Sequence, residues 1–189
     1  FIEISCENNS YAYDQSSIPN PEISRDEIID KLASHGLWPS IRQRPFSKIA
    51  NLEDTPKSIF ITAMPTAPFA LDLEHVLKEN SSGIKMGLSI MSKLTSGDVN
   101  LVMDKNKTYT IFDDCKDFVP HEFSGPHPSG NTGIHIHHID PISGKNDIVW
   151  YLSLQDLNDI GNFFNTPNVC WRHKLTANIR SSDKSVVVI

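Results

Sequence analysis

The sequence predicts an α/β domain with a mainly parallel β-sheet. Apolar segments of strand length, several of them rich in β-branched residues, alternate along the chain with segments whose apolar residues recur at helical spacing. The run at residues 58–64, SIFITAM, is mostly apolar and suits a strand buried on both faces. Strands that alternate with helices form βαβ units, and such units place neighbouring strands parallel.

The N-terminal part predicts short strands, a linker and then a helix. Residues 1–13 alternate in part between apolar and polar, and residues 14–22 are turn-forming. Ser24 and Glu27 then match a capping box, in which each side chain binds a free backbone amide at the helix start. Gly36 supplies the stop.

The rest of the chain predicts further alternation. Strands are expected at residues 58–64, 99–103, 108–112 and 147–152, and helices at residues 72–78, 82–94 and from the cap Ser153 onward. We therefore divide the chain into the end of a preceding domain or linker (1–22), the α/β domain (23–165) and a C-terminal segment that could begin a following domain (166–189). Because the chain opens in a strand pattern without Met, we expect it to be a fragment of a longer polypeptide.

Composition restricts the possible functions. The chain has 189 residues and a net charge of −6 with interspersed acids and bases, which argues weakly against a nucleic-acid surface. The three cysteines, Cys6, Cys115 and Cys170, are far apart and form no CxxC motif. We therefore expect neither a disulfide framework nor a thiolate metal site, and we expect the protein to be in a reducing compartment. No apolar run is long enough to cross a bilayer.

The stretch GPHPSGNTGIHIHHID, residues 125–140, holds a cluster of histidines. We expect a glycine- and proline-shaped loop that enters a strand, with His135 and His137 on one face and His138 on the other. His121 or His127 could supply a third ligand to a metal, but no known metal-ligand spacing requires it. The histidines are therefore expected to form hydrogen bonds, and a metal site is the less favoured interpretation.

Other motifs of cofactor or nucleophile chemistry are missing. Gly125, Gly130 and Gly133 do not form GxGxxG after a strand, and Pro126 and Pro128 remove two amide donors that a phosphate cradle would use. No GxSxG or Cys–His signature is present. We expect no catalytic residue and no metal ligand in this piece.

A basic aromatic segment is the strongest candidate for ligand binding. Trp38, Arg42, Arg44, Phe46 and Lys48 lie within eleven residues of sequence. Guanidinium donors beside aromatic rings could hold a planar carbonyl compound such as a quinone. The alternative is a surface connection in which Trp38 packs against the helix and the arginines pair with acids.

Four long strings together resemble one family. They are residues 36–50 (GLWPSIRQRPFSKIA), 58–72 (SIFITAMPTAPFALD), 123–143 (FSGPHPSGNTGIHIHHIDPIS) and 149–164 (VWYLSLQDLNDIGNFF). In order and content they resemble the A subunit of the Na⁺-translocating NADH:quinone oxidoreductase (Na⁺-NQR), a bacterial respiratory complex. The resemblance covers most of residues 24–164.

The resemblance implies a fold and a function. It implies a Rossmann-like three-layer domain similar to the flavin-binding domain of the NADH-binding subunit of complex I, but without a cofactor of its own. It implies a peripheral location on the cytoplasmic side of the bacterial inner membrane, with the other subunits of the complex as partners. Those subunits would hold NADH, flavins and an iron–sulfur centre, ubiquinone would be the substrate, and electron transfer would drive sodium export.

The resemblance also directs attention to particular residues. Quinone contact is expected at Trp38, Arg42, Arg44 and Phe46, and contact with a partner or ligand at His127, His135, His137 and His138. Two alternatives stay open: a cofactor-free structural platform, and a metal-dependent enzyme built on the histidines.

Overall fold

The structure is a computed structural model that describes residues 23–68, 70, 73, 81–113, 115–165, 174–177 and 185–188. The strands expected at residues 1–13, the linker at 14–22 and, apart from Leu73, the helix expected at 72–78 lie outside the described residues.

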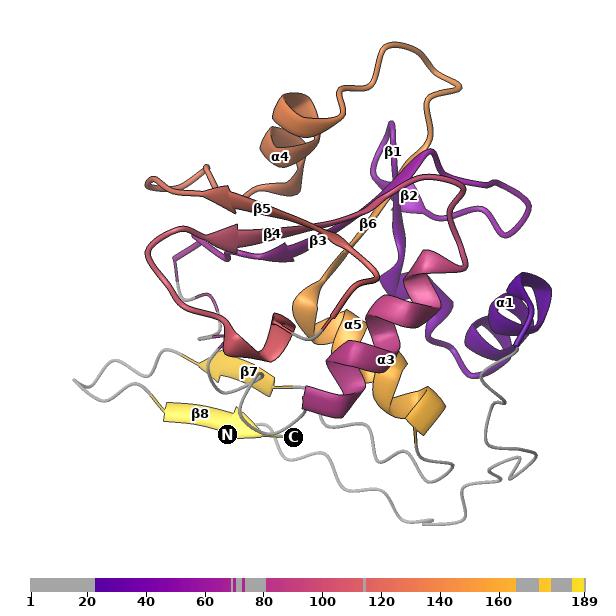
Figure 1. Cartoon of the computed structure of the whole chain (residues 1–189), viewed down its shortest axis with the longest axis horizontal. Helices are drawn as coiled ribbons and strands as arrows, with labels where there is room; N and C mark the ends of the chain where they lie inside the picture. The colour runs from indigo at the N-terminus through magenta and orange to yellow at the C-terminus, as the bar shows by residue number, and fades with distance from the viewer. Residues whose placement is uncertain are drawn as a thin grey trace.

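A six-stranded mixed sheet forms the centre of the fold (Figure 1). Its strands are β1 (Arg42–Arg44), β2 (Lys48–Ile49), β3 (Ser58–Ala63), β4 (Val99–Asp104), β5 (Val119–Phe123) and β6 (Val149–Ser153), in the spatial order β2-β1-β6-β3-β4-β5. The four strands β6, β3, β4 and β5 are parallel, whereas β1 pairs antiparallel with β6 and β2. The prediction of a parallel sheet is thus confirmed for these four strands, and an antiparallel hairpin extends it.

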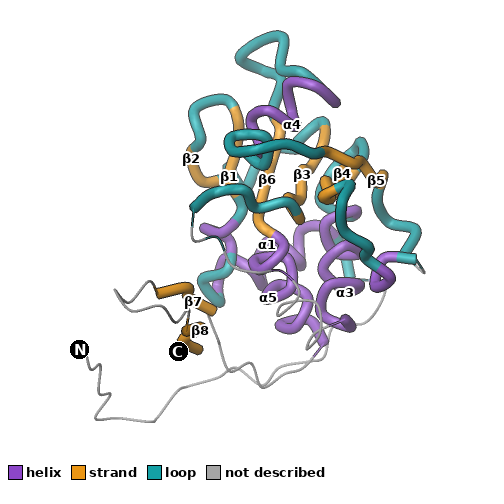
Figure 2. The backbone as a smooth tube through the Cα atoms, turned by 90° about the vertical axis from the view of Figure 1, so that its left-hand side faces the viewer, coloured by secondary structure: helices purple, strands orange, loops and turns teal. Residues whose placement is uncertain are grey.

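Helices cover both faces of the sheet (Figure 2). One face carries α1 (Arg25–Ser34), α3 (Ser81–Ser92) and α5 (Leu154–Asn165), and the other carries the short helix α4 (Thr132–Ile139). Two 3₁₀ turns, η1 (Trp38–Ser40) and η2 (Thr110–Phe112), lie in connections, and β7 (Lys174–Ala177) pairs antiparallel with β8 (Ser185–Val188). The α/β class is confirmed.

The helix starts follow the expected capping chemistry. In α1, the Ser24 amide donates to Oε2 of Glu27 at 2.9 Å, and the Glu27 amide donates to Oγ of Ser24 at 3.3 Å. In α5, Ser153 and Asp156 exchange the equivalent bonds at 3.3 and 3.1 Å. These bonds satisfy amides that have no acceptor inside the helix, which is why the boundaries could be predicted from sequence.

Strand β3 is buried on both faces, as its sequence predicts. Ile59 and Ile61 pack into the cluster beneath the three helices, whereas Phe60 packs with Ile136 of α4 on the opposite face. Full burial of such side chains contributes roughly 1.5–3 kcal/mol each. The central strand therefore joins the two halves of the core.

Helices α3 and α5 approach closely through glycine. A Cβ atom built on Gly161 would overlap the carbonyl oxygen of Gly83, and one built on Gly87 would overlap the carbonyl oxygen of Leu157. The two helices can approach this closely only because these α-carbons carry no side chain, so the glycines of α3 and α5 are packing residues.

The prediction of a strand at residues 108–112 is wrong. This segment forms η2, where the Tyr109 hydroxyl donates to the carbonyl oxygen of Ala63 at 3.1 Å and the ring of Phe112 packs against Phe118. The strand beside β4 is instead β5, which contains Pro120. Proline is tolerated there because β5 is the last strand of the sheet and needs no bonds on its outer side.

Candidate functional site

The basic aromatic segment forms the β1–β2 hairpin at one edge of the sheet. Its tip holds two consecutive non-glycine residues in the left-handed region, Phe46 with φ 74° and Ser47 with φ 53°. Such backbone is strained for residues that carry a Cβ. The Phe46 side chain is 76% exposed, so burial of the ring does not offset this strain within the described chain. Strained backbone that presents an exposed aromatic ring is a reason to look for a binding function.

Three side chains hold the hairpin tip against β6. Nη2 of Arg42 donates to the carbonyl oxygen of Ser47 at 2.5 Å, and the hydroxyl groups of Ser47 and Tyr151 lie 2.5 Å apart. The Arg44 guanidinium lies over the Tyr151 ring, with Cζ 5.3 Å from the ring centroid. Such a cation–π contact orients the guanidinium. Arg42, Arg44 and Phe46 therefore lie in the same hairpin at one edge of the sheet.

Tyr151 belongs to this group but is missed by the sequence reasoning. Arg42 pairs with Tyr151, and Arg44 with Val149, in the antiparallel register of β1 and β6. Residues two apart in a strand point to the same face, so this register brings the two arginines and the tyrosine together. The pairing joins segments more than one hundred residues apart, and the only local signal is a tyrosine in an apolar strand.

The fourth predicted quinone residue, Trp38, lies apart from the exposed tip. Its side chain is buried, its Nε1 donates to the carbonyl oxygen of Ala50 at 2.7 Å, and its ring meets Trp150 edge-on with 5.4 Å between centroids. Trp38 thus packs in the core beneath the hairpin and does not present its ring to solvent.

The histidine segment is a helix, and the prediction of a strand is wrong. Residues 132–139 form α4, which follows the loop at the carboxyl end of β5. Asn131 has extended backbone at the N-cap position, and the apolar residues Ile136 and Ile139 pack toward the sheet. A run of eight residues with two adjacent histidines carries no clear period, so tertiary packing of the isoleucines decided the outcome.

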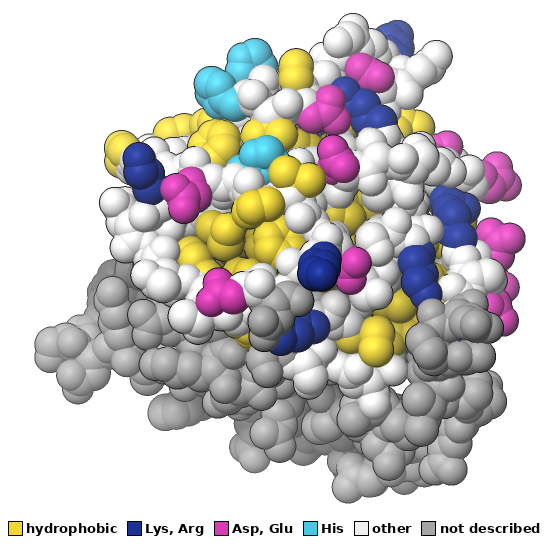
Figure 3. All heavy atoms as spheres, in the orientation of Figure 1, with side chains coloured by type: hydrophobic (Ala, Val, Ile, Leu, Met, Phe, Trp, Pro, Cys, Tyr) yellow, Lys and Arg dark blue, Asp and Glu magenta, His cyan; other side chains and the backbone are white. Residues whose placement is uncertain are grey.

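The helical geometry separates the four histidines. His135 is fully buried, its Nε2 donates to the carbonyl oxygen of Ser129 at 2.8 Å, and its ring packs edge-on against Phe123. His137 and His138 are exposed and contact each other, and Figure 3 shows histidine side chains standing out from the surface at α4. His127 lies in the loop before α4, and its Nδ1 is 3.3 Å from the hydroxyl of Thr66, in the loop that follows β3.

Burial sets the protonation state of His135. It lowers the pKa of this imidazole, the proximity of His138 lowers it too, and the bond to Ser129 only partly opposes the shift. A neutral histidine with one bonded nitrogen is a structural residue that holds the loop onto α4. Within the described ranges, no three His, Cys, Asp or Glu side chains come close enough to hold a metal ion.

A cavity of about 270 Å³ opens at the carboxyl ends of β3 and β6. After β3 the chain forms β4 and β5 on one side of β3, and it then passes through α4 to form β6 on the other side of β3. The strand order therefore reverses between β3 and β6, at the position of the cavity. Ligands of open α/β sheets bind at such points. The lining comprises Thr62, Pro65, Thr66, Ala67, Leu73, Gly130, Asn131, Ser153, Leu154 and Gln155.

Gly130 brings the histidine loop to this cavity. Its amide donates to the Thr66 hydroxyl at 3.0 Å, and a Cβ on it would overlap the carbonyl oxygen of Met64. The loop therefore lies at the carboxyl end of the sheet, and its glycine allows close packing onto the end of β3.

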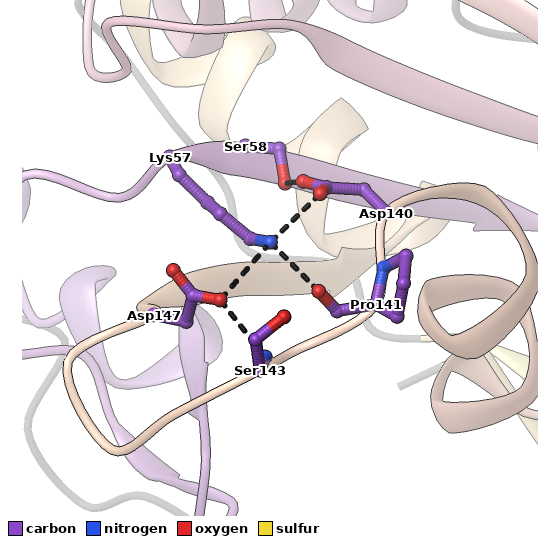
Figure 4. Close-up of polar contacts among 6 residues, drawn as sticks. All are labelled: Lys57, Ser58, Asp140, Pro141, Ser143 and Asp147. Carbon is purple, nitrogen blue, oxygen red and sulfur yellow. Dashed lines mark hydrogen bonds and ion pairs between the residues drawn. The ribbon is translucent and has the colours of Figure 1, made fainter.

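An ion-pair network fixes the connection from α4 to β6 (Figure 4). Nζ of Lys57 lies 2.7 Å from Oδ1 of Asp140 and 3.6 Å from Oδ2 of Asp147, and it donates to the carbonyl oxygen of Pro141 at 2.9 Å. The Ser58 hydroxyl donates to the other Asp140 oxygen at 2.6 Å. Burial tends to raise the pKa of Asp140, but the bonds from Lys57 and Ser58 outweigh it and the net pKa is lowered.

In the part of the chain that the structure describes, no helix is long and apolar enough to cross a bilayer. The longest described helices have 12 residues, whereas a membrane span needs about 20.

Comparison with known proteins shows which family this chain is similar to. Residues 23–169 match the family described as NqrA second alpha/beta domain. The A subunit of the Na⁺-translocating NADH-quinone reductase of Histophilus somni strain 129Pt is 39% identical over 148 residues, which are 78% of this chain and 33% of that protein. The corresponding protein of Rhodopirellula baltica is 40% identical over 144 residues, 76% of this chain and 31% of that protein.

The chain spans about one third of the length of these curated relatives. The family match covers the whole six-stranded sheet and every helix described above, from α1 to the end of α5. This chain therefore belongs to the NqrA family, and its residues 23–169 correspond to the second α/β domain of that family.

Proposed function

We propose that this chain acts as one domain of NqrA in a sodium-translocating NADH-quinone reductase, where it contributes to assembly and contacts quinone with the β1–β2 hairpin. The whole complex would pass electrons from NADH to ubiquinone and couple this transfer to sodium export. The domain itself would carry out no chemical step.

The observations that support quinone contact are the exposed Phe46 ring at a strained hairpin tip and the two arginines of the adjoining strand β1. A quinone head group is planar and carries two carbonyl acceptors. An aromatic ring can stack on it, and Arg42 and Arg44 can donate to its oxygens. Few side chains supply both kinds of contact, and the hairpin presents them together on one edge.

The position in the complex is part of the proposal. We place the chain peripherally on the cytoplasmic side of the membrane, with the flavins, the iron–sulfur centre and the NADH site in other subunits. The six-stranded sheet with helices on both faces is compatible with descent from a flavin-binding domain like that of complex I. The missing glycine fingerprint agrees with loss of the cofactor during that descent.

Steady-state kinetics of the assembled complex test the quinone contact. The variants Arg42→Gln, Arg44→Gln and Phe46→Leu should each raise KM for a short-chain ubiquinone by roughly five- to tenfold, the effect of losing about one hydrogen bond or stacking contact. Lys48→Gln removes an exposed charge from the same hairpin and serves as the matched control. Unchanged KM in all three variants would contradict the proposal.

A structural platform is the second candidate. It is favoured by the exposure of the apolar residues Ile49 (47%) and Leu52 (41%), which follow Phe46 within the same short segment. In this case, another protein of the complex covers the edge. Ile49→Ser and Leu52→Ser should then reduce co-purification of the other subunits while KM for quinone stays unchanged in the complex that still assembles.

The metal-dependent enzyme gains no support from the geometry. Its two central candidates, His135 and His137, do not converge: His135 is buried and bonded to Ser129, whereas His137 is exposed.

A further inference from the structure

Tyr151 of β6 makes two different contacts with the β1–β2 hairpin. Its hydroxyl shares a hydrogen bond with the hydroxyl of Ser47, with 2.5 Å between the two oxygens. Its ring lies under the Arg44 guanidinium, with 5.3 Å between Cζ and the ring centroid. The hydroxyl therefore reaches the hairpin tip, whereas the ring supports the strand that leads to the tip.

The body of Tyr151 is held by the core of the domain. Tyr151 pairs with Phe60 in the parallel register of β6 and β3, and its side chain packs against the apolar cluster that contains Phe60 and Ile136. Phe60 is fully buried. Side chains that pack on a dense core keep one low-energy rotamer, so the Tyr151 ring is a rigid support for the groups that rest on it.

The hairpin tip depends on such a support. Phe46 and Ser47 have φ values of 74° and 53°, a conformation that is unfavourable for residues with a Cβ. The Phe46 ring is 76% exposed, so its own packing does not hold the tip in place. Ser47 is held through its hydroxyl by Tyr151 and through its carbonyl oxygen by Nη2 of Arg42. The position of Phe46 therefore depends on the bonds of its neighbour Ser47.

The two contacts of Tyr151 can be separated by substitution. Phenylalanine at this position would keep the packing on the core and the cation–π contact with Arg44, but it would lose the bond to Ser47. Leucine would lose both contacts, because it carries neither an aromatic face nor a hydroxyl. The hydroxyl acts on the tip alone, and the ring acts on the guanidinium.

We infer that Tyr151 is a positioning residue for the proposed quinone contact. Its ring orients the Arg44 guanidinium, and its hydroxyl, through Ser47, fixes the tip that carries Phe46. This role rests on the proposed function, in which both groups touch the quinone. Groups that are already in place bind a ligand more tightly, because less conformational freedom is lost on binding. Tyr151 itself needs no contact with the quinone.

Steady-state kinetics of the assembled complex test this role. Tyr151→Phe and Ser47→Ala break the same bond, so each should raise KM for a short-chain ubiquinone about three- to tenfold, and the double variant should raise it no further. Tyr151→Leu should raise KM more than Tyr151→Phe, since Arg44 also loses its support. We expect kcat to stay unchanged in each variant, because only binding is affected. Additive effects of the two single variants would contradict the inference.

Tyr109→Phe is the matched control. The Tyr109 hydroxyl also joins two segments, since it donates to the carbonyl oxygen of Ala63 at 3.1 Å. It belongs to the connection between β4 and β5, which lie on the opposite side of β3 from the hairpin. Tyr109→Phe should lower the midpoint of thermal unfolding, as Tyr151→Phe does, but it should leave KM unchanged. This comparison separates positioning from a general loss of stability.

Two further results would overturn the inference, and they differ in what they mean for the quinone proposal. KM could rise in Arg42→Gln, Arg44→Gln and Phe46→Leu but stay unchanged in Tyr151→Phe, as in Tyr109→Phe. In that case, the hairpin contacts quinone without help from Tyr151. If KM is unchanged in all of these variants, the hairpin does not contact quinone, and the inference fails together with the proposed function.

Discussion

The ammonium nitrogen of Lys57 lies 2.7 Å from Oδ1 of Asp140, and this ion pair joins the start of β3 to the loop that leaves α4. The second oxygen of Asp140 accepts from Ser58, whose side chain is buried. One carboxylate therefore anchors the crossover from α4 to β6 at the edge of the core. The position of α4, and with it the histidine loop and the neighbour of Arg44, depends on this anchor.

Replacement of Asp140 by alanine should lower the free energy of unfolding by about 1–3 kcal/mol. The main cost is the buried Ser58 hydroxyl left without an acceptor, because the Lys57 pair is partly exposed and screened. Urea denaturation at neutral pH measures the change. Asp147→Asn is the matched control, since its oxygen lies 3.6 Å from Lys57, and it should cost clearly less. Equal losses in the two variants would contradict this account.

Acidification should loosen α4 through His135. Because its pKa is lowered in the folded state, the unfolded chain binds a proton more readily, and stability falls as the pH drops below about 6.5. Hydrogen exchange of the amides at residues 132–139 should be faster at about pH 5.5 than at about pH 7.5, after correction for intrinsic rates. His135→Gln should remove most of this pH dependence, and His137→Gln, at an exposed position, should not.

Gly161→Ala should destabilise the domain by about 2–3 kcal/mol. The added methyl group would overlap the backbone of Gly83, which is the kind of overpacking that a helix pair cannot relieve by a rotamer change. Gly144→Ala makes the same chemical change where nothing lies within 4 Å of the new atom, and should change stability by less than about 0.5 kcal/mol. Thermal unfolding of both variants decides the point; a tolerated Gly161→Ala would mean that the crossing of α3 and α5 can open.

Phe46→Asn should raise stability by about 0.5–1 kcal/mol and weaken quinone binding. Asparagine adopts the left-handed region more easily than phenylalanine, and little buried apolar area is lost because the ring is exposed. Denaturant midpoints measure the first effect, and KM for quinone in the assembled complex measures the second. Lower stability would show that the ring packs on the protein in solution.

Local chemistry explains which elements could be predicted from the sequence. The starts of α1 and α5 depend on side chains within three residues of the bonds they make, and the apolar run of β3 identifies a buried strand wherever it lies in the sheet. The family, too, could be identified from four strings of residues.

The errors have a different cause. Proline and charge in residues 119–123 argue against a strand, and only the edge position beside β4 makes β5 possible. Residues 132–139 carry no strong period, and only the packing of Ile136 on Phe60 makes them a helix.

The candidate site, too, has features that the sequence predicts and features that depend on the tertiary structure. By itself, the sequence determined the α/β class, the capped helices and a segment in which arginine and aromatic residues lie close together. Only the tertiary structure decided that Trp38 belongs to the core, that Tyr151 lies beneath Arg44, and that Arg44 faces the first turn of α4. The physical reason is register: antiparallel pairing of β1 with β6 joins residues about one hundred positions apart, and no local pattern encodes which face their side chains share.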